Sequence, residues 1–166
     1  MHNRQKGDSV SVTKASIRGI GLAQACAIVD AALAASRERG LRPMTIAVVD
    51  AGGDLVAFKR EDHTGIRRFE IAFGKAFGAL VMNRSSRAVG DIGARNPLFI
   101  QSIMAATGGR IIPTPGGVLI KEPAGLIIGA VGSSGDEAHE DEAVAVNAIR
   151  SVGLIPEPEE PGPPGH

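Results

Sequence analysis

The sequence predicts an α+β domain in which helices cover an antiparallel sheet. Two apolar runs flank Gly52-Gly53, and three further runs follow Gly109 with only short Pro/Gly turns between them. Strands joined by such short turns lie antiparallel to each other. The sequence also lacks the β–α–β alternation of parallel sheets, which supports the same prediction.

The first half of the chain predicts a helix followed by a hairpin. Apolar residues recur at helical spacing from Ser16 to Arg39, and Gly40 is placed to end that helix. Thr45–Asp50 and Leu55–Arg60 are rich in Val, Ile and Phe, and the glycine pair between them suits a tight turn. These two runs are predicted to be paired strands.

A second amphipathic helix is predicted over Arg67–Val81. Phe69, Phe73 and Phe77 share one face of it, whereas Lys75 is turned away from them. The two faces therefore predict two different neighbours for this helix.

The second half of the chain predicts short helices, a three-stranded meander and a final helix. The segments are a short helix over Ser85–Arg95, an apolar stretch from Pro97 to Gly108-Gly109, strands around Arg110–Pro113, Val118–Glu122 and Leu126–Gly132, and a helix over Asp136–Val152.

Length and composition predict a single domain. The chain has 166 residues, of which 14–154 are assigned to the domain, 1–13 to a flexible N-terminus and 155–166 to a disordered or draped Pro/Glu-rich tail. Eighteen basic residues balance eighteen acidic ones, so no net charge attracts nucleic acid or an anionic membrane. No apolar run is long enough to cross a bilayer, and Cys26 is the single cysteine. We therefore expect a cytoplasmic protein without nucleic-acid or membrane partners.

Three stretches together carry a family resemblance. They are AVVDAGGDLVAFKRED, the helix IAFGKAFGAL, and PTPGGVLI followed by GAVGSSGDEAHEDEAVAVNAI. The chain resembles the GlcG/HbpS-like family, which includes haem-binding proteins and the C-terminal domain of PduO-type corrinoid adenosyltransferases. The resemblance runs from about Ile17 to Leu154. It implies a profilin-like five-stranded antiparallel sheet flanked by helices, assembly into homo-oligomers, and haem or another tetrapyrrole as a ligand.

The predicted ligand surface lies on the second helix. Gly74 and Gly78 are four residues apart and leave a shallow furrow, and Lys75 lies beside it. This surface suits a planar tetrapyrrole, with Lys75, Arg67 and Arg68 holding its propionates. The alternative is that the glycines permit close packing and that Lys75 pairs with an acid.

His63 is the candidate axial ligand. It follows Glu61 and Asp62 in the loop after the second strand, where a neutral imidazole can ligate haem iron or act as a general base. The alternative is an exposed loop histidine without a ligand.

A second hypothesis is a small catabolic enzyme without a cofactor. In this interpretation Glu61, His63, Glu70 and Lys75 act on an organic acid or carbonyl compound, with a general base and an electrostatic clamp. A non-catalytic sensor or accessory role in haem and redox handling, or beside a catabolic pathway, also stays open.

A metal site is a further candidate near the last helix. Asp136, His139 and Glu142 are spaced three apart, so one helical face can hold all three. The alternative is a solvated first turn whose acids complement the helix dipole.

Overall fold

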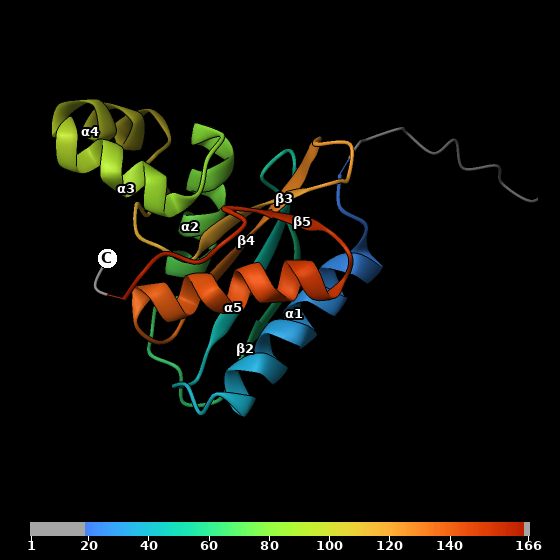
Figure 1. The fold of residues 1–166 in the computed structure, drawn as a ribbon. Coiled ribbons are helices and arrows are strands. Elements are labelled where there is room, and N and C mark those ends of the chain that lie inside the picture. The colour runs from blue at the N-terminus through green and yellow to red at the C-terminus, as the bar shows by residue number, and fades with distance from the viewer. Residues whose placement is uncertain (1–18, 165–166) are drawn as a thin grey trace, which may run out of the picture.

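The computed structural model describes residues 19–164 and places a five-stranded sheet between helices (Figure 1). The strand order is β2-β1-β4-β3-β5, and every neighbouring pair is antiparallel. Helices α1 and α5 pack on one face of the sheet, and α2 packs on the other. The elements are α1 Leu22–Glu38, β1 Thr45–Asp50, β2 Leu55–Arg60, α2 Arg68–Met82, α3 Ser86–Arg95, α4 Pro97–Ala106, β3 Gly117–Lys121, β4 Ile127–Ser134, α5 Ala138–Ser151 and β5 Ile155–Glu157. The predicted α+β class is confirmed.

The β1–β2 hairpin forms where the sequence predicts it. The side chain of Asp50 accepts hydrogen bonds from the N–H groups of Gly52 and Asp54, at 2.9 and 3.0 Å. Gly53 adopts a φ of 84°, which a residue with a side chain rarely tolerates. The turn therefore combines an Asp acceptor with a glycine at the left-handed position.

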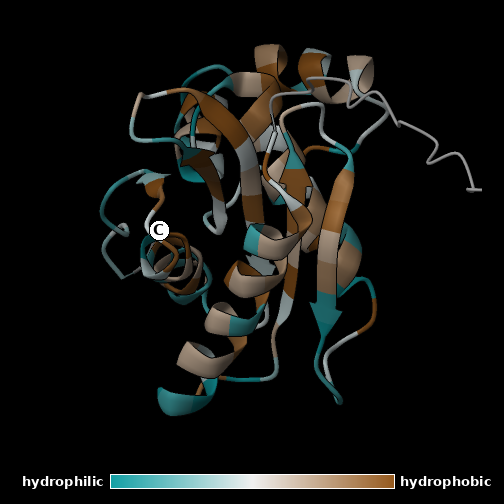
Figure 2. Ribbon diagram, turned by 90° about the vertical axis from the view of Figure 1, so that its right-hand side faces the viewer, coloured by the Kyte–Doolittle hydropathy of each residue, from teal (hydrophilic) through white to brown (hydrophobic). Residues whose placement is uncertain are grey.

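The larger part of the core lies between the sheet and the α1/α5 layer. Ile28 and Val29 from α1 and Ile149 from α5 are buried there against Ile46 and Val131 of the sheet. Figure 2 shows the corresponding concentration of hydrophobic residues on the strands. On the other face α2 contacts the sheet almost directly, because a Cβ atom on Gly132 would lie 1.8 Å from the carbonyl oxygen of Ala72.

One predicted strand is wrong. Residues 110–113 are not a strand but an extended loop that packs on α2, where the N–H of Ile112 donates to the carbonyl of Gly74 at 3.1 Å. The fifth strand is instead β5, which pairs with β3 and lies in the segment predicted as a tail. Ile155 and Pro156 supply the apolar surface that this edge strand needs, and Pro156 is buried.

The chain after β5 folds back over α5 and α3. The N–H of Gly162 donates to Oε2 of Glu142 at 2.6 Å, and the Nε of Arg87 lies 3.1 Å from both oxygens of the same buried carboxylate. Residues 155–164 therefore have a defined structure that packs over α5 and α3. This corrects the expectation of a disordered tail and agrees with the alternative of a draped one. Residues 165–166 lie outside the described residues.

The start of α1 is the part of the N-terminal predictions that can be compared with the structure. Helix α1 begins at Leu22 instead of Ser16. Its first hydrogen bond runs from the N–H of Ala25 to the carbonyl of Gly21 at 3.0 Å, whereas the N–H of Ile20 donates to the carbonyl of Ile128 at 2.8 Å. The flexible segment predicted for 1–13 lies outside the described residues. Within residues 19–164, none of the helices combines the length and apolarity that crossing a membrane requires.

Candidate functional site

The glycine furrow of α2 is filled by the protein itself. A Cβ atom on Gly74 would lie 2.6 Å from Cγ1 of Ile112 and 2.7 Å from the carbonyl oxygen of Arg110. A Cβ atom on Gly78 would lie 2.8 Å from Cγ2 of Ile111. The glycines permit the close approach of residues 110–112, so the predicted ligand furrow is a packing contact.

Lys75 is part of a buried ion pair. Its Nζ lies 2.7 Å from Oδ2 of Asp141 and 3.0 Å from the carbonyl oxygen of Ser133, and its side chain is 4% exposed. Burial lowers the pKa of Lys75, and attraction to Asp141 opposes part of that shift. The same burial raises the pKa of Asp141. Lys75 is therefore not exposed to a ligand, which corrects its assignment to propionate binding and to the catalytic cluster.

The other side of α2 carries a row of aromatic rings. We call Phe58, Phe69, Phe73 and Phe77 the phenylalanine row; they are four of the five phenylalanines of a chain without Tyr or Trp. Successive ring centroids are 4.9, 5.8 and 5.7 Å apart, and the guanidinium of Arg110 lies 4.3 Å from the centroid of Phe77. The row runs from β2 along α2.

A β-bulge in β2 turns Leu55 and Phe58 toward the face of the sheet on which α2 lies. The register shifts between Val48 and Val49, so Val56 and Ala57 both pack toward the α1/α5 core. Leu55 and Phe58 are then free to point to the α2 face, where both line a recess. We call this the aromatic recess; it has a volume of about 740 Å³, opens broadly to solvent, and is lined by Leu55, Phe58, Arg60, Ile66, Arg67, Phe69 and Glu70.

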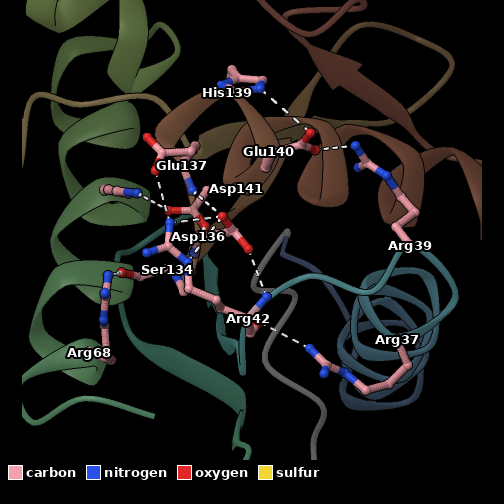
Figure 3. A network of polar contacts seen from close by, with 12 residues as sticks. Arg37, Arg39, Arg42, Arg68, Ser134, Asp136, Glu137, His139, Glu140 and Asp141 are labelled. Atoms are coloured by element: carbon pink, nitrogen blue, oxygen red, sulfur yellow. Dashed lines mark hydrogen bonds and ion pairs between the residues drawn. The ribbon is translucent and has the colours of Figure 1, made fainter. Parts of the chain in front are cut away.

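The charges around the aromatic recess are not equivalent. Arg67 lies 2.6 Å from Glu70, which lowers the pKa of Glu70 through the hydrogen bond between them. Arg68 donates to the hydroxyl of Ser134 at 3.1 Å (Figure 3). Arg60 has no ion-pair partner within residues 19–164, and so it is the cation at this recess that is free to meet an anionic ligand.

His63 lines a separate, neighbouring recess. This polar recess has a volume of about 500 Å³ and is lined by Arg37, Pro43, Arg60, Glu61, Asp62 and His63. Arg60 is common to both recesses, so they adjoin each other. His63 is exposed and adopts a φ of 65°, a strained value for a residue with a side chain.

The four residues of the hypothetical enzyme cluster are dispersed. Glu61 is held at 2.9 Å by Arg37 and accepts the N–H of Met44 at 2.6 Å. Glu70 lines the aromatic recess, His63 lines the polar recess, and Lys75 is buried with Asp141. The structure therefore does not bring these groups together as a general base and an electrostatic clamp.

The predicted metal ligands near α5 also have other partners (Figure 3). Asp136 pairs with Arg42 at 2.9 Å, His139 lies 3.5 Å from Glu140, and Glu142 is buried on Arg87. The Arg42 hydrogen bond lowers the pKa of Asp136 to about 2. Within residues 19–164 no group of His, Cys, Asp or Glu side chains is arranged to hold a metal ion.

Four residues of the candidate ligand surface are absent from the predicted site: Leu55, Phe58, Arg60 and Ile66. The helical spacing of Phe69, Phe73 and Phe77 was the available signal, but spacing alone does not distinguish a buried stripe from a partly exposed one. Leu55 and Phe58 of β2 reach the recess because of the bulge, and the residue types of the strand do not predict that bulge.

A comparison with known families identifies the fold. A family model described as "Haem degrading protein HbpS-like" matches residues 20–150. The chain belongs to the HbpS-like family. The match covers most of the chain and confirms the resemblance drawn from the motifs. No curated protein matches the chain significantly.

Solved structures share the HbpS-like fold at low sequence identity. A PduOC:heme complex is 20% identical, with a TM-score of 0.73, and the match covers 82% of this chain and 96% of that one. Klebsiella pneumoniae ORFY is 24% identical at a TM-score of 0.74, with 87% and 98% covered. HbpS is 23% identical at a TM-score of 0.69, with 89% and 98% covered. These structures show the fold, and the ligand in the first belongs to that protein.

Proposed function

We propose that the protein binds haem or a related tetrapyrrole in the aromatic recess. The observation that carries the proposal is a recess of about 740 Å³. Its apolar walls come from Leu55, Phe58, Ile66 and Phe69, and its cation Arg60 has no ion-pair partner among residues 19–164. Ligand sites of this kind combine apolar surface with few polar groups, and aromatic rings stack well on a flat macrocycle. Membership of the HbpS-like family and the haem-bound relative support the same ligand class.

The chemistry of these residues fits the ligand. Phe58 and Phe69 offer ring faces and edges to the macrocycle, and Arg60 offers a planar guanidinium to a propionate carboxylate. Bound haem supplies a redox-active iron, which suits a protein of haem and redox handling or one accessory to a catabolic pathway. In this proposal the residues of the recess bind and orient the ligand, and Glu70 keeps Arg67 occupied.

A hemin titration of the purified full-length protein tests the proposal. We expect a saturable Soret shift at micromolar hemin, with affinity roughly tenfold lower in Phe69→Ala and in Arg60→Met. Leu98→Ala is the control, because Leu98 is an exposed apolar residue of α4 that does not line the recess. Absence of a saturable shift, or an equal loss in the control, would contradict the proposal.

His63 is the proposed axial ligand: from the polar recess that it lines, which adjoins the aromatic recess at Arg60, its imidazole would hold the iron of a bound haem. Hemin and iron-free protoporphyrin IX distinguish this role from simple packing. We expect His63→Ala to move the Soret maximum of the hemin complex and to leave protoporphyrin affinity unchanged. An unchanged hemin spectrum would remove His63 from the site.

A further inference from the structure

A further cavity lies between α2 and the loop that packs on it. It has a volume of about 290 Å³ and is more enclosed than the aromatic recess, which it adjoins at Phe69 and Glu70. We call it the loop pocket; it is lined by Phe69, Glu70, Phe73, Gly109, Arg110 and Ile112. Strand β2 takes no part in it, so the loop pocket is distinct from the proposed tetrapyrrole site.

Both walls of the loop pocket are fixed by contacts within the protein. On α2, the ring centroids of Phe69 and Phe73 are 5.8 Å apart. On the loop, the N–H of Ile112 donates to the carbonyl of Gly74 at 3.1 Å, and the N–H of Gly109 donates to the carbonyl of Met104 at 2.7 Å. A small ligand therefore meets a pocket that is already formed, which lowers the entropic cost of binding.

Arg110 is the polar group of the loop pocket that is free to bind a ligand. Its Nε donates to the carbonyl of Thr107 at 3.2 Å, and its guanidinium carbon lies 4.3 Å from the ring centroid of Phe77. Among residues 19–164, the Nη groups of Arg110 have no ion-pair or hydrogen-bond partner. The guanidinium is thus held in place while its terminal N–H groups stay available, and such a planar fork suits a carboxylate.

The charges of the loop pocket favour an anion over a cation. Glu70 is the acid in its lining, and the guanidinium of Arg67 lies 2.6 Å from that carboxylate and compensates its charge. Arg110 has no such compensation, so an incoming carboxylate gains a partner and an incoming ammonium meets repulsion.

The volume and the lining favour a single aromatic ring. An apolar cavity of about 150 Å³ accommodates benzene, so about 290 Å³ holds one ring with a short acidic side chain and excludes a tetrapyrrole. Phe69 and Phe73 offer rings with which a ligand ring can stack or make edge contacts, and Ile112 closes the apolar surface from the loop.

We propose that the loop pocket binds a small aromatic monocarboxylate. The ring of the ligand lies against Phe69 and Phe73, and its carboxylate is held by the guanidinium of Arg110. This site goes beyond the proposed function and does not rest on it, because neither Arg60 nor β2 contributes to it.

Titration of the full-length protein with phenylacetate tests the proposal by calorimetry. We expect saturable binding with a Kd of about 1 mM or tighter, and roughly tenfold weaker binding in Arg110→Met. Arg84→Met is the matched control, because Arg84 is also an exposed arginine whose Nε donates to a backbone carbonyl, that of Met82 at 3.1 Å, and it does not line the pocket. Phenylacetamide has the same shape without the charge, so Arg110→Met should leave its weaker binding unchanged.

Two further measurements place the ligand. In the wild-type protein, the amide NMR signals of Gly109 and Ile112 should shift on addition of phenylacetate, and this readout needs no variant. Arg60→Met should keep wild-type affinity for phenylacetate, because Arg60 lines the aromatic recess and not the loop pocket. Circular dichroism confirms that each variant is folded.

The outcomes separate this site from the proposed function. Phenylacetate that fails to saturate, or an equal loss of affinity in Arg110→Met and Arg84→Met, overturns the loop-pocket site and leaves haem binding untouched. A loss in Arg60→Met as large as that in Arg110→Met moves the acid to the aromatic recess and also overturns it. Saturable binding that depends on Arg110 in a protein indifferent to hemin supports the loop-pocket site and removes the proposed function.

Discussion

Helix α2 carries a charge on its buried side and half-buried aromatic rings on another side, and the two sides have different neighbours. On the buried side Lys75 is fully paired with Asp141 and Ser133. On the other side Phe69 lines an open recess beside Arg60, which has no ion-pair partner in the part of the chain that the structure describes. A buried charge needs its partner, because removing that partner leaves an uncompensated charge inside the fold, whereas an unsatisfied charge beside apolar surface is available to a ligand. The buried side of α2 therefore has a structural role, and ligand binding is our proposal for the other side.

The largest expected effect is on the buried side. Lys75→Met leaves the carboxylate of Asp141 buried without its cation, and we expect a loss of about 3–5 kcal/mol in the free energy of unfolding. Urea denaturation measures it. Adding Asp141→Asn should restore most of the loss, because the amide oxygen still accepts the N–H groups of Gly135 and Asp136. A single variant as stable as wild type would show that the pair is not structural.

The second prediction concerns the close packing of residues 110–112 on α2. Gly74→Ala forces a methyl group against Ile112 and the carbonyl of Arg110, so we expect about 1–3 kcal/mol of destabilisation. Gly65→Ala is the control, since its nearest neighbour is an arginine side chain at 3.5 Å. Thermal melts of both variants measure the difference. Equal melting temperatures would mean that residues 110–112 do not pack on α2 as closely as described.

A smaller effect contrasts the buried pair with the partly exposed pair of Arg42 and Asp136. The pKa of Asp136 is about 2 in the folded protein against 3.8 ordinarily, so this pair stabilises the fold above about pH 4. The contribution is lost as pH falls from about 4 to about 2. We expect only a small contribution, because solvent screens the pair. Urea titrations between pH 6 and pH 3 should show a shallower acid dependence in Arg42→Ala, and identical slopes would contradict it.

The smallest expected effect is on ligand binding by the stabilised double variant. Lys75→Met with Asp141→Asn removes both charges from the buried side and leaves the aromatic recess intact. We expect hemin affinity within about threefold of wild type, because fully buried groups do not touch the ligand. Spectroscopic titration measures it. A large loss of affinity in a folded double variant would move the site back toward the buried side.

The elements were predictable from local patterns, whereas several partners were not. The Gly52-Gly53 turn and the helical spacing of Phe69 and Phe73 predict β2 and α2 from the sequence alone. The partner of Lys75 is 66 residues away in sequence, so no local pattern identifies Asp141 as its counterion. Likewise the apolar run at 110–113 resembles a strand, but the space offered by two helical glycines makes it a loop packed on α2.

The β5 strand is the opposite case, because the composition of its segment predicts disorder and the structure has a strand there. Proline and glutamate around Pro156 predict disorder by composition, yet three residues suffice to pair with the edge of β3. A short edge strand gains its stability from the sheet that it joins, and the sequence of the strand alone does not record that surface. The residue pattern and the family resemblance both predict five strands, but the fifth strand of the structure is Ile155–Glu157 and not the run at 110–113.

A crystal structure of the full-length protein with hemin tests the central claim most directly. The account predicts that the macrocycle lies against Phe58 and Phe69, with a propionate at Arg60 and with the ion pair of Lys75 and Asp141 unchanged. Hemin bound in contact with Lys75, with residues 110–112 displaced from α2, would contradict it.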